Sequence, residues 1–67
     1  MDDLYLAPTF DVMIWGYVYP NITAPTLKDA KYIATVLWNA NPPDEIEVEE
    51  NDIHIVARKA NTFDEWE

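Results

Sequence analysis

The hydrophobic positions of the chain form three patterned segments, and the first of them predicts a β-strand. Residues 10–19 are rich in β-branched and aromatic side chains, and Pro20-Asn21 closes the run with residues that favour a turn. Gly16 within this run indicates a β-bulge or a close packing contact. A short apolar segment at residues 4–6 is a candidate edge strand.

The second segment predicts an α-helix over residues 27–39. Thr26 is followed three residues later by Asp29, a spacing that resembles a capping box. Apolar side chains then recur at helical spacing, at Leu27, Ala30, Ile33, Ala34, Leu37 and Ala40. Pro42-Pro43 is expected to end the helix, because a residue before proline is disfavoured in the helical conformation.

The third segment predicts a β-hairpin over residues 45–58. Hydrophobic and polar residues alternate on both sides of Asn51-Asp52, a pair that tolerates the left-handed conformations of tight turns. A two-residue loop would pair Glu50 with Ile53, Glu49 with His54, Val48 with Ile55, Glu47 with Val56, Ile46 with Ala57 and Glu45 with Arg58. This register turns four apolar side chains toward the helix, those of Ile46, Val48, Ile55 and Ala57.

Together these elements predict a small α+β domain with a (β)βαββ arrangement, in which one helix packs on one face of a mostly antiparallel sheet. Residues 1–67 are expected to form one domain, with residues 61–67 as a tail. A chain of 67 residues buries only about 60% of its unfolded surface. We therefore expect a thin hydrophobic core.

The composition indicates a folded, acidic protein rather than a disordered tail. Hydrophobic residues make up 49% of the chain, and the net charge is −9. A phosphate-binding surface needs clustered Lys and Arg, of which the chain has four, so direct binding of nucleic acid is not expected. The chain has no cysteine, no basic stretch after Met1 and no long apolar run, which predicts a cytoplasmic protein without membrane contact.

Residues suited to catalysis are scarce. The chain has neither Ser nor Cys, and its single histidine, His54, is expected to pair with Glu49 across the hairpin. The carboxylates between Asp44 and Asp52 alternate between the two faces of a strand, so they are not expected to form a metal cage. We therefore predict a protein that is not an enzyme and that uses no cofactor and no metal.

The predicted strand 45–49 would present a row of carboxylates on one face, those of Glu45, Glu47 and Glu49. Alternate residues of a strand are spaced by about 6.6 to 6.8 Å, an interval comparable to that of neighbouring phosphates on a nucleic-acid strand. Such a row could mimic DNA, with Arg58 opposite Glu45 neutralising part of it. The alternative is a solvated sheet edge whose charges discourage aggregation.

The predicted strand 10–19 would leave an aromatic stripe on its open face. If Phe10, Val12, Ile14 and Val18 meet the helix, the opposite parity exposes Asp11, Met13, Trp15, Tyr17 and Tyr19. Met, Trp and Tyr are typical of the buried core of a protein interface. The alternatives are that the stripe pairs two copies of the chain, or that Phe63 and Trp66 of the tail or residues 4–6 fold over it.

The segment Ala24 to Ala34, Ala-Pro-Thr-Leu-Lys-Asp-Ala-Lys-Tyr-Ile-Ala, with an alternating hairpin after it and Trp66 in the tail, resembles a layout shared by many very small phage proteins. Among them it is similar to the type I-F anti-CRISPR inhibitors, and more loosely to a small phage inhibitor of bacterial RNA polymerase. The resemblance implies a phage-encoded antagonist of a host machine that acts by binding. The anti-CRISPR relative uses basic residues, so its target and its contact residues are not transferred to this acidic chain.

These observations lead to the hypothesis of an inhibitor that binds a host protein with a basic, nucleic-acid-handling surface. The expected contact residues are the carboxylates Glu45, Glu47, Glu49, Glu50 and Asp52, with Trp15, Tyr17 and Tyr19 as aromatic anchors. An anti-defence role and inhibition of host RNA polymerase are two versions of this hypothesis. A structural or regulatory homodimer, whose acidity serves only solubility, is the alternative.

Overall fold

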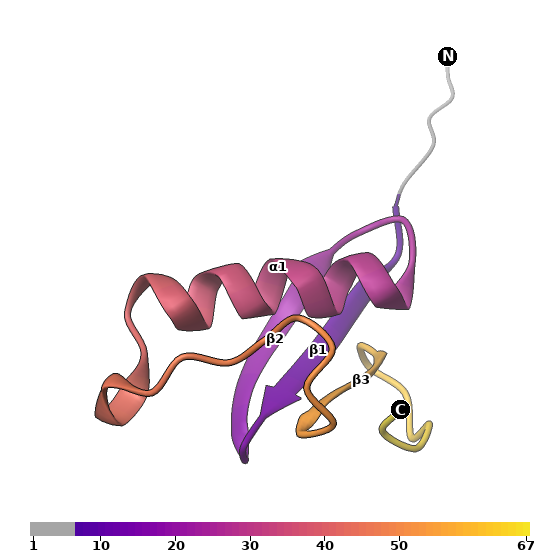
Figure 1. Cartoon of the computed structure of the whole chain (residues 1–67). Helices are drawn as coiled ribbons and strands as arrows, with labels where there is room; N and C mark the ends of the chain where they lie inside the picture. The colour runs from indigo at the N-terminus through magenta and orange to yellow at the C-terminus, as the bar shows by residue number, and fades with distance from the viewer. Residues whose placement is uncertain (1–6) are drawn as a thin grey trace.

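Three antiparallel strands and one helix make up a small α+β fold, which confirms the predicted fold class. The computed structural model describes residues 7–67, so the candidate strand at residues 4–6 lies outside the described residues. The sheet has the order β2-β1-β3, with β1 in the centre (Figure 1). The elements are β1 (Thr9–Ile14), β2 (Tyr17–Thr23), α1 (Leu27–Ala40), the single 3₁₀ turn η1 (Pro43–Glu45) and β3 (Ile55–Lys59).

A two-residue turn at Trp15-Gly16 divides the predicted strand 10–19 into β1 and β2. Both residues have a positive φ, 51° at Trp15 and 86° at Gly16, as a type I′ hairpin turn requires. A Cβ added at Gly16 would meet no atom within 4 Å, so this glycine supplies a backbone conformation and not a close packing contact. The prediction of one continuous strand, with Gly16 as a bulge or contact, was therefore wrong.

The free edge of β2 is interrupted at Pro20 and Asn21. The pairing of β1 with β2 is irregular between Phe10 and Val12, and Asn21 adopts a φ of 60° while its N–H donates to Asp11 Oδ1 at 3.2 Å. Pro20 has no N–H to offer to another strand. These features discourage the addition of a further strand at this edge.

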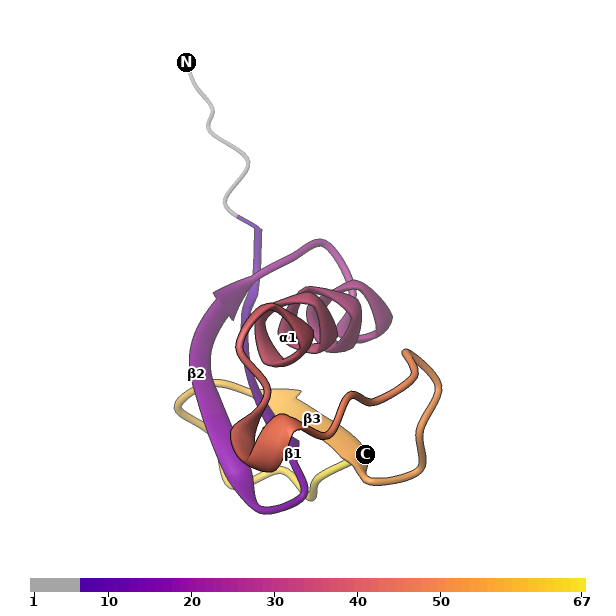
Figure 2. The same ribbon diagram turned by 60° about the vertical axis from the view of Figure 1, so that its left-hand side comes forward.

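The helix α1 confirms the prediction for residues 27–39 and extends it by one residue. The N–H of Asp29 donates to Thr26 Oγ1 at 3.1 Å, which is the expected N-cap contact. Ala30 and Ala34 are fully buried, because their small side chains face the sheet. The view nearly along α1 in Figure 2 shows the helix lying over one side of the sheet.

The hydrophobic core lies between α1 and the sheet. Phe10, Val12 and Ile14 alternate on the helix side of β1 and are buried as predicted. Val18 was expected to join them but is 52% exposed. The turn at Trp15-Gly16 pairs Val18 with Met13 and places both on the outer face of the sheet, whereas Tyr17 and Tyr19 pair with Ile14 and Val12 on the helix side.

The predicted hairpin over residues 45–58 does not form. Two successive tight turns replace its loop, with the N–H of Asp52 donating to the Glu49 carbonyl and the N–H of Ile55 donating to the Asp52 carbonyl, both at 3.0 Å. The strand β3 instead pairs with β1, so the Glu49–His54 pairing and the rest of the predicted register were wrong. Val48, Ile55 and Ala57 are buried as expected, but Ile46 is exposed.

Pairing with β1 suits the side chains of β3 better than pairing with residues 45–49. Ile55 and Ala57 lie beside Ile14 and Val12 in the core, and Arg58 lies opposite Asp11 on the outer face. Pairing with the acidic segment, residues 44–52, would have placed the carboxylate of Glu47 opposite Val56 instead. The central strand β1 thus has a partner on each side, and Ile55 and Ala57 are buried beside it.

The C-terminal residues 60–67 run along the side of the sheet away from α1 (Figures 1 and 2). Glu67 and Ala57 exchange two backbone hydrogen bonds, at 2.8 and 2.9 Å. The guanidinium carbon of Arg58 lies 4.5 Å from the centre of the Trp66 ring, whereas Phe63 is fully exposed. Trp66 therefore lies against Arg58 of β3, whereas Phe63 does not fold over the sheet, so the alternative in which both residues cover the aromatic stripe was wrong.

Candidate functional site

The acidic segment is attached to the helix through backbone hydrogen bonds to two side chains of α1. Trp38 Nε1 donates to the Ile46 carbonyl at 2.6 Å. The Asn39 amide donates from Nδ2 to the Val48 carbonyl and accepts at Oδ1 from the Val48 N–H, both at 2.9 Å. Asn39 thus gives Val48 the two hydrogen bonds that a neighbouring strand would give, which explains how residues 46–49 stay extended without a strand partner.

We expect the Asn39→Ala variant to loosen the acidic segment without unfolding the domain. The change leaves the partly buried N–H and C=O of Val48 without their partner, which costs about 1–3 kcal/mol of the free energy of unfolding. Hydrogen exchange at the Val48 amide should accelerate. Asn41→Ala is the control, because the side chain of Asn41 is exposed and makes no hydrogen bond in the structure. Equal stability of the two variants would contradict this role of Asn39.

The carboxylates of the segment point into solvent, as the sequence predicted. Glu45, Glu47, Glu49 and Glu50 are all exposed, although none of them lies on a strand. Glu45 ends the turn η1, Glu47 and Glu49 lie on an irregular segment, and Glu50 begins the next turn. Arg58 is opposite Asp11 and not opposite Glu45, so the expected neutralisation of the row does not occur. Among residues 7–67 the one acidic side chain within 4.0 Å of a basic side chain is Asp52, beside His54.

His54 connects the acidic segment to the hairpin turn. Its ring stacks on Trp15, with centroids 3.5 Å apart and planes inclined by 17°, and its carbonyl accepts from the Trp15 N–H at 3.3 Å. Asp52 Oδ1 lies 2.8 Å from the His54 backbone nitrogen and 2.9 Å from Nδ1 of its ring. These contacts explain how a bulky residue is held at positive φ in the turn.

The contacts with His54 hold the pKa of Asp52 below that of an ordinary aspartate. The largest cause is the hydrogen bond from the His54 backbone N–H, followed by the bond from its side chain. Since the folded-state pKa is depressed, the Asp52 carboxylate stabilises the fold above the unfolded-state pKa, about 3.9 for an aspartate. This contribution is lost as the pH falls through the lower, folded-state pKa.

We therefore expect the Asp52→Asn variant to be less stable than the wild type near pH 7 and to match it in strong acid. Urea denaturation at a series of pH values measures the difference. Asp64→Asn is the matched control, because Asp64 is exposed and its carboxylate makes no hydrogen bond in the structure. A constant difference between wild type and Asp52→Asn from pH 7 to pH 2 would contradict the linkage.

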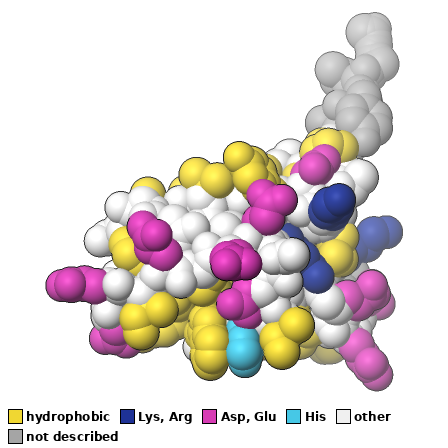
Figure 3. All heavy atoms as spheres, in the orientation of Figure 1, with side chains coloured by type: hydrophobic (Ala, Val, Ile, Leu, Met, Phe, Trp, Pro, Cys, Tyr) yellow, Lys and Arg dark blue, Asp and Glu magenta, His cyan; other side chains and the backbone are white. Residues whose placement is uncertain are grey.

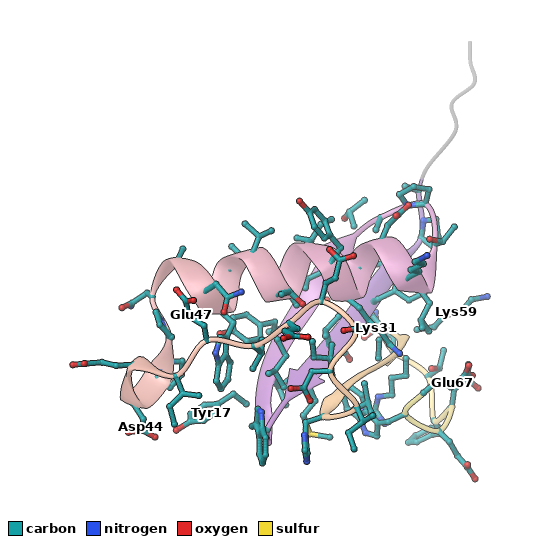
Figure 4. All side chains as sticks on the ribbon, in the orientation of Figure 1. Tyr17, Lys31, Asp44, Glu47, Lys59 and Glu67 are labelled. Atoms are coloured by element: carbon teal, nitrogen blue, oxygen red, sulfur yellow. The ribbon has the colours of Figure 1, made fainter. Side chains whose placement is uncertain are left out.

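An open, mostly apolar hollow of about 280 Å³ lies between the hairpin turn and the start of the acidic segment. Tyr17 meets Trp38 edge to face, with ring centroids 5.5 Å apart. Trp15 and Tyr17 are 53% and 50% exposed, so they keep free surface beside the hollow. Figure 4 shows Tyr17 close to Asp44, at the end of the molecule where Glu47 also lies. The residues that line the hollow are Trp15, Tyr17, Trp38, Pro43, Asp44 and Ile46.

The structure brings together only some of the residues that the sequence singled out. Trp15 and Tyr17 lie beside the acidic segment, but Tyr19 is partly buried against the core and Met13 lies on the outer face of the sheet. The predicted stripe of these four side chains is therefore divided by the turn. Asp52 is only partly exposed, and its carboxylate is engaged by His54.

Sequence reasoning missed the residues that build and support this site from α1 and η1. Trp38 and Asn39 occur at the end of a helix whose pattern indicated only packing, and their hydrogen bonds to residues 46 and 48 depend on the fold. Pro42-Pro43 signalled the end of the helix, and a turn toward the acidic segment could have been inferred from it. Nothing in the local pattern indicated the positive φ of Asp44, 56°.

Charge is unevenly distributed over the surface. In Figure 3 the Asp and Glu side chains are spread over the whole face, including its right-hand side, whereas the Lys and Arg side chains gather at the right. Figure 4 places Lys31 and Lys59 near Glu67, at the end away from Asp44. No group of three or more His, Asp or Glu side chains within residues 7–67 is arranged to hold a metal ion. In the same residues no helix has the length and apolar character needed to cross a membrane.

Comparison of the chain with known protein families, with curated proteins and with solved structures gives no significant match.

Proposed function

We propose that this protein is a binding domain that occupies a basic, nucleic-acid-binding surface of another protein. The observation that supports this proposal is the position of Asp44 beside the exposed rings of Trp15 and Tyr17, at the start of a segment that carries the exposed carboxylates Glu45, Glu47 and Glu49. Carboxylates without a basic neighbour attract a cationic partner and speed its association. Aromatic side chains that become buried on contact slow its dissociation.

The attachment of the acidic segment favours this function because it reduces the cost of binding. The hydrogen bonds from Trp38 and Asn39 fix the backbone at Ile46 and Val48, so this segment loses little conformational freedom when a partner binds. The exposed carboxylates on either side of Val48 then keep a spacing of about 6.6 to 6.8 Å, as in an extended chain. A pair of carboxylates with this spacing suits a groove that accepts a phosphate backbone, and Glu45, in the turn η1 with a φ of 59°, adds a third carboxylate outside the extended spacing.

The sequence resemblance to small phage inhibitors is the reason to seek the partner among bacterial proteins that handle nucleic acid. The alternating hairpin included in that resemblance is replaced by the β1–β3 pairing, so the resemblance supports the class of partner more than any particular target. An anti-defence inhibitor and an inhibitor of RNA polymerase are the two versions of this proposal. In both, the domain acts by occupying the site and not by catalysis.

Capture from a bacterial lysate tests the proposal. Tagged protein should retain nucleic-acid-binding proteins at low salt, and added double-stranded DNA should release them, because DNA and the acidic segment would compete for one surface. The variant with Glu45, Glu47 and Glu49 changed to Gln should retain less of the same proteins. Retained proteins that ignore both the DNA and the three substitutions would contradict the proposal.

A further inference from the structure

The hollow beside the acidic segment has the size of a side chain and not of a metabolite. Its volume of about 280 Å³ lies just below the range of about 300–1,000 Å³ that is usual for small-molecule sites. It is also open to solvent at one side, so it would not enclose a free ligand. A side chain that projects from a partner protein fits such a depression better.

The chemistry of the lining favours a cation. Asp44 is the one charged residue that lines the hollow, and no Lys or Arg lines it. Glu45 follows directly in the chain, and both residues are exposed. Trp15 and Tyr17 offer partly exposed rings, Trp15 with one ring face stacked on His54, and the face of an aromatic ring attracts a cation. An apolar side chain would gain nothing from Asp44, whereas a cationic side chain would gain from both the carboxylate and the rings.

Among cations, arginine suits this combination better than lysine. Its guanidinium is planar and weakly hydrated, so it can stack on a ring while its edge donates two hydrogen bonds to a carboxylate. The protein already contains a contact between an arginine and an aromatic ring, because the guanidinium carbon of Arg58 lies 4.5 Å from the centre of the Trp66 ring. Lysine presents a compact, strongly hydrated ammonium that stacks less well.

The backbone at the mouth of the hollow holds the carboxylates in an unusual arrangement. Asp44 and Glu45 have successive positive φ values of 56° and 59°, a left-handed conformation that Asp tolerates but that is unfavourable for a residue such as Glu. The N–H of Glu45 donates to the Pro42 carbonyl at 3.1 Å, and that of Ile46 donates to the Pro43 carbonyl at 3.3 Å, which closes the turn. Strained turns of this type are concentrated at binding sites.

We propose that the hollow receives the guanidinium of an arginine side chain from the basic partner, with Asp44 as its carboxylate and the rings of Trp15 and Tyr17 as its stacking surfaces. This inference rests on the proposed function, because it assumes a basic partner. The inference adds that one position of the partner prefers arginine to lysine. Attraction by net charge alone would not produce this preference.

Three synthetic peptides test the preference. Each is an octapeptide that alternates glycine with arginine, lysine or the neutral arginine analogue citrulline, and binding is followed at low salt by NMR shifts of the indole and backbone amides. The arginine peptide should bind about twofold to fivefold more tightly than the lysine peptide of equal charge. It should shift the signals of Trp15, Tyr17 and Asp44, and the citrulline peptide should shift none of them.

Two substitutions separate the carboxylate from the rings. Asp44→Asn removes the charge but keeps a residue that tolerates positive φ, and Tyr17→Leu removes the ring but keeps an apolar side chain. Each should abolish the preference for arginine over lysine. The controls are Asp64→Asn and Tyr32→Leu, since Asp64 is an exposed acid and Tyr32 is a half-exposed tyrosine on α1, both outside the hollow. Backbone amide spectra show whether each variant is folded.

The outcomes distinguish this inference from the proposed function. Equal binding of the arginine and lysine peptides, unaffected by Asp44→Asn, would overturn the arginine site and leave the attraction to basic surfaces intact. Binding of the neutral citrulline peptide at the same residues would contradict the claim that the hollow requires a cationic side chain, and would indicate an apolar contact. Absence of binding by both cationic peptides at low salt would overturn the inference together with the proposed attraction.

Discussion

Replacement of Trp38 by alanine is expected to leave much of the protein unfolded at 25 °C. Trp38 is 3% exposed and lies in the core between α1 and the sheet. Truncation of a buried tryptophan costs about 3–5 kcal/mol, and a domain of 67 residues has a total stability of only about 3–10 kcal/mol. Circular dichroism during urea denaturation would measure the loss.

Two further variants separate the contributions of Trp38. Trp38→Phe keeps an aromatic ring but removes the Nε1 donor to the Ile46 carbonyl, so it should lose about 1 kcal/mol for the hydrogen bond in addition to some packing. Trp66→Ala is the control, because Trp66 is only partly buried and its ring contacts Arg58 at the surface. A Trp38→Ala protein as stable as Trp66→Ala would contradict the position of Trp38 in the core.

The second large effect is expected on the rate at which the partner associates. Changing Glu45, Glu47 and Glu49 to Gln removes three of the thirteen acidic residues but keeps the size of each side chain. Because all three are exposed, folding should be unaffected or slightly favoured by reduced self-repulsion. Association with the captured partner should slow by about tenfold at low salt, since electrostatic steering depends on charges close to the contact.

The control for this variant is a matched set of three substitutions in the C-terminal segment, Asp64→Asn, Glu65→Gln and Glu67→Gln. These residues are also exposed, and their replacement makes the net charge of −9 less negative by the same three charges. They lie outside the acidic segment, so they should slow association much less. If both triple variants slow it equally, net charge and not the position of the carboxylates controls the encounter.

The helix and the core were predictable because their signals are local. The Thr26 cap, the helical spacing of Ala30 and Ala34 and the alternation of Phe10, Val12 and Ile14 each depend on residues close in the chain. The fold class followed from these patterns. Physical rules of capping and periodicity are sufficient for such elements.

The turn at Trp15-Gly16 and the partner of β3 were not predictable in the same way. Tryptophan at positive φ is rare, and here it depends on a stack with His54, which is distant in sequence. The alternation of residues 45–49 is compatible both with a hairpin strand and with a segment whose backbone pairs with the Asn39 amide. Which structure forms depends on whether β3 pairs with β1 or with residues 45–49. That choice depends on contacts throughout the chain.

The candidate site was predictable in part. Exposure of Glu45, Glu47 and Glu49 was predicted from alternation, but only Val48 of the intervening residues is buried, because Ile46 is exposed as well. The proximity of Tyr17 to Asp44 could not be predicted from the pattern, because it requires the hairpin turn to bring Tyr17 to the helix side of the sheet. A hollow built from three distant segments leaves no sequence pattern of its own.

The salt dependence of association tests the central claim most directly, namely that the exposed carboxylates of the acidic segment attract a basic surface. The association rate of the captured partner would be measured by stopped flow for the wild type and for the Glu45, Glu47 and Glu49 to Gln variant from low to high ionic strength. Exposed charges are screened over about 8 to 10 Å near physiological ionic strength. We predict a steep fall in rate for the wild type, a shallow fall for the variant, and convergence of the two at high salt. Rates that are equal for both proteins at every salt concentration would contradict the claim.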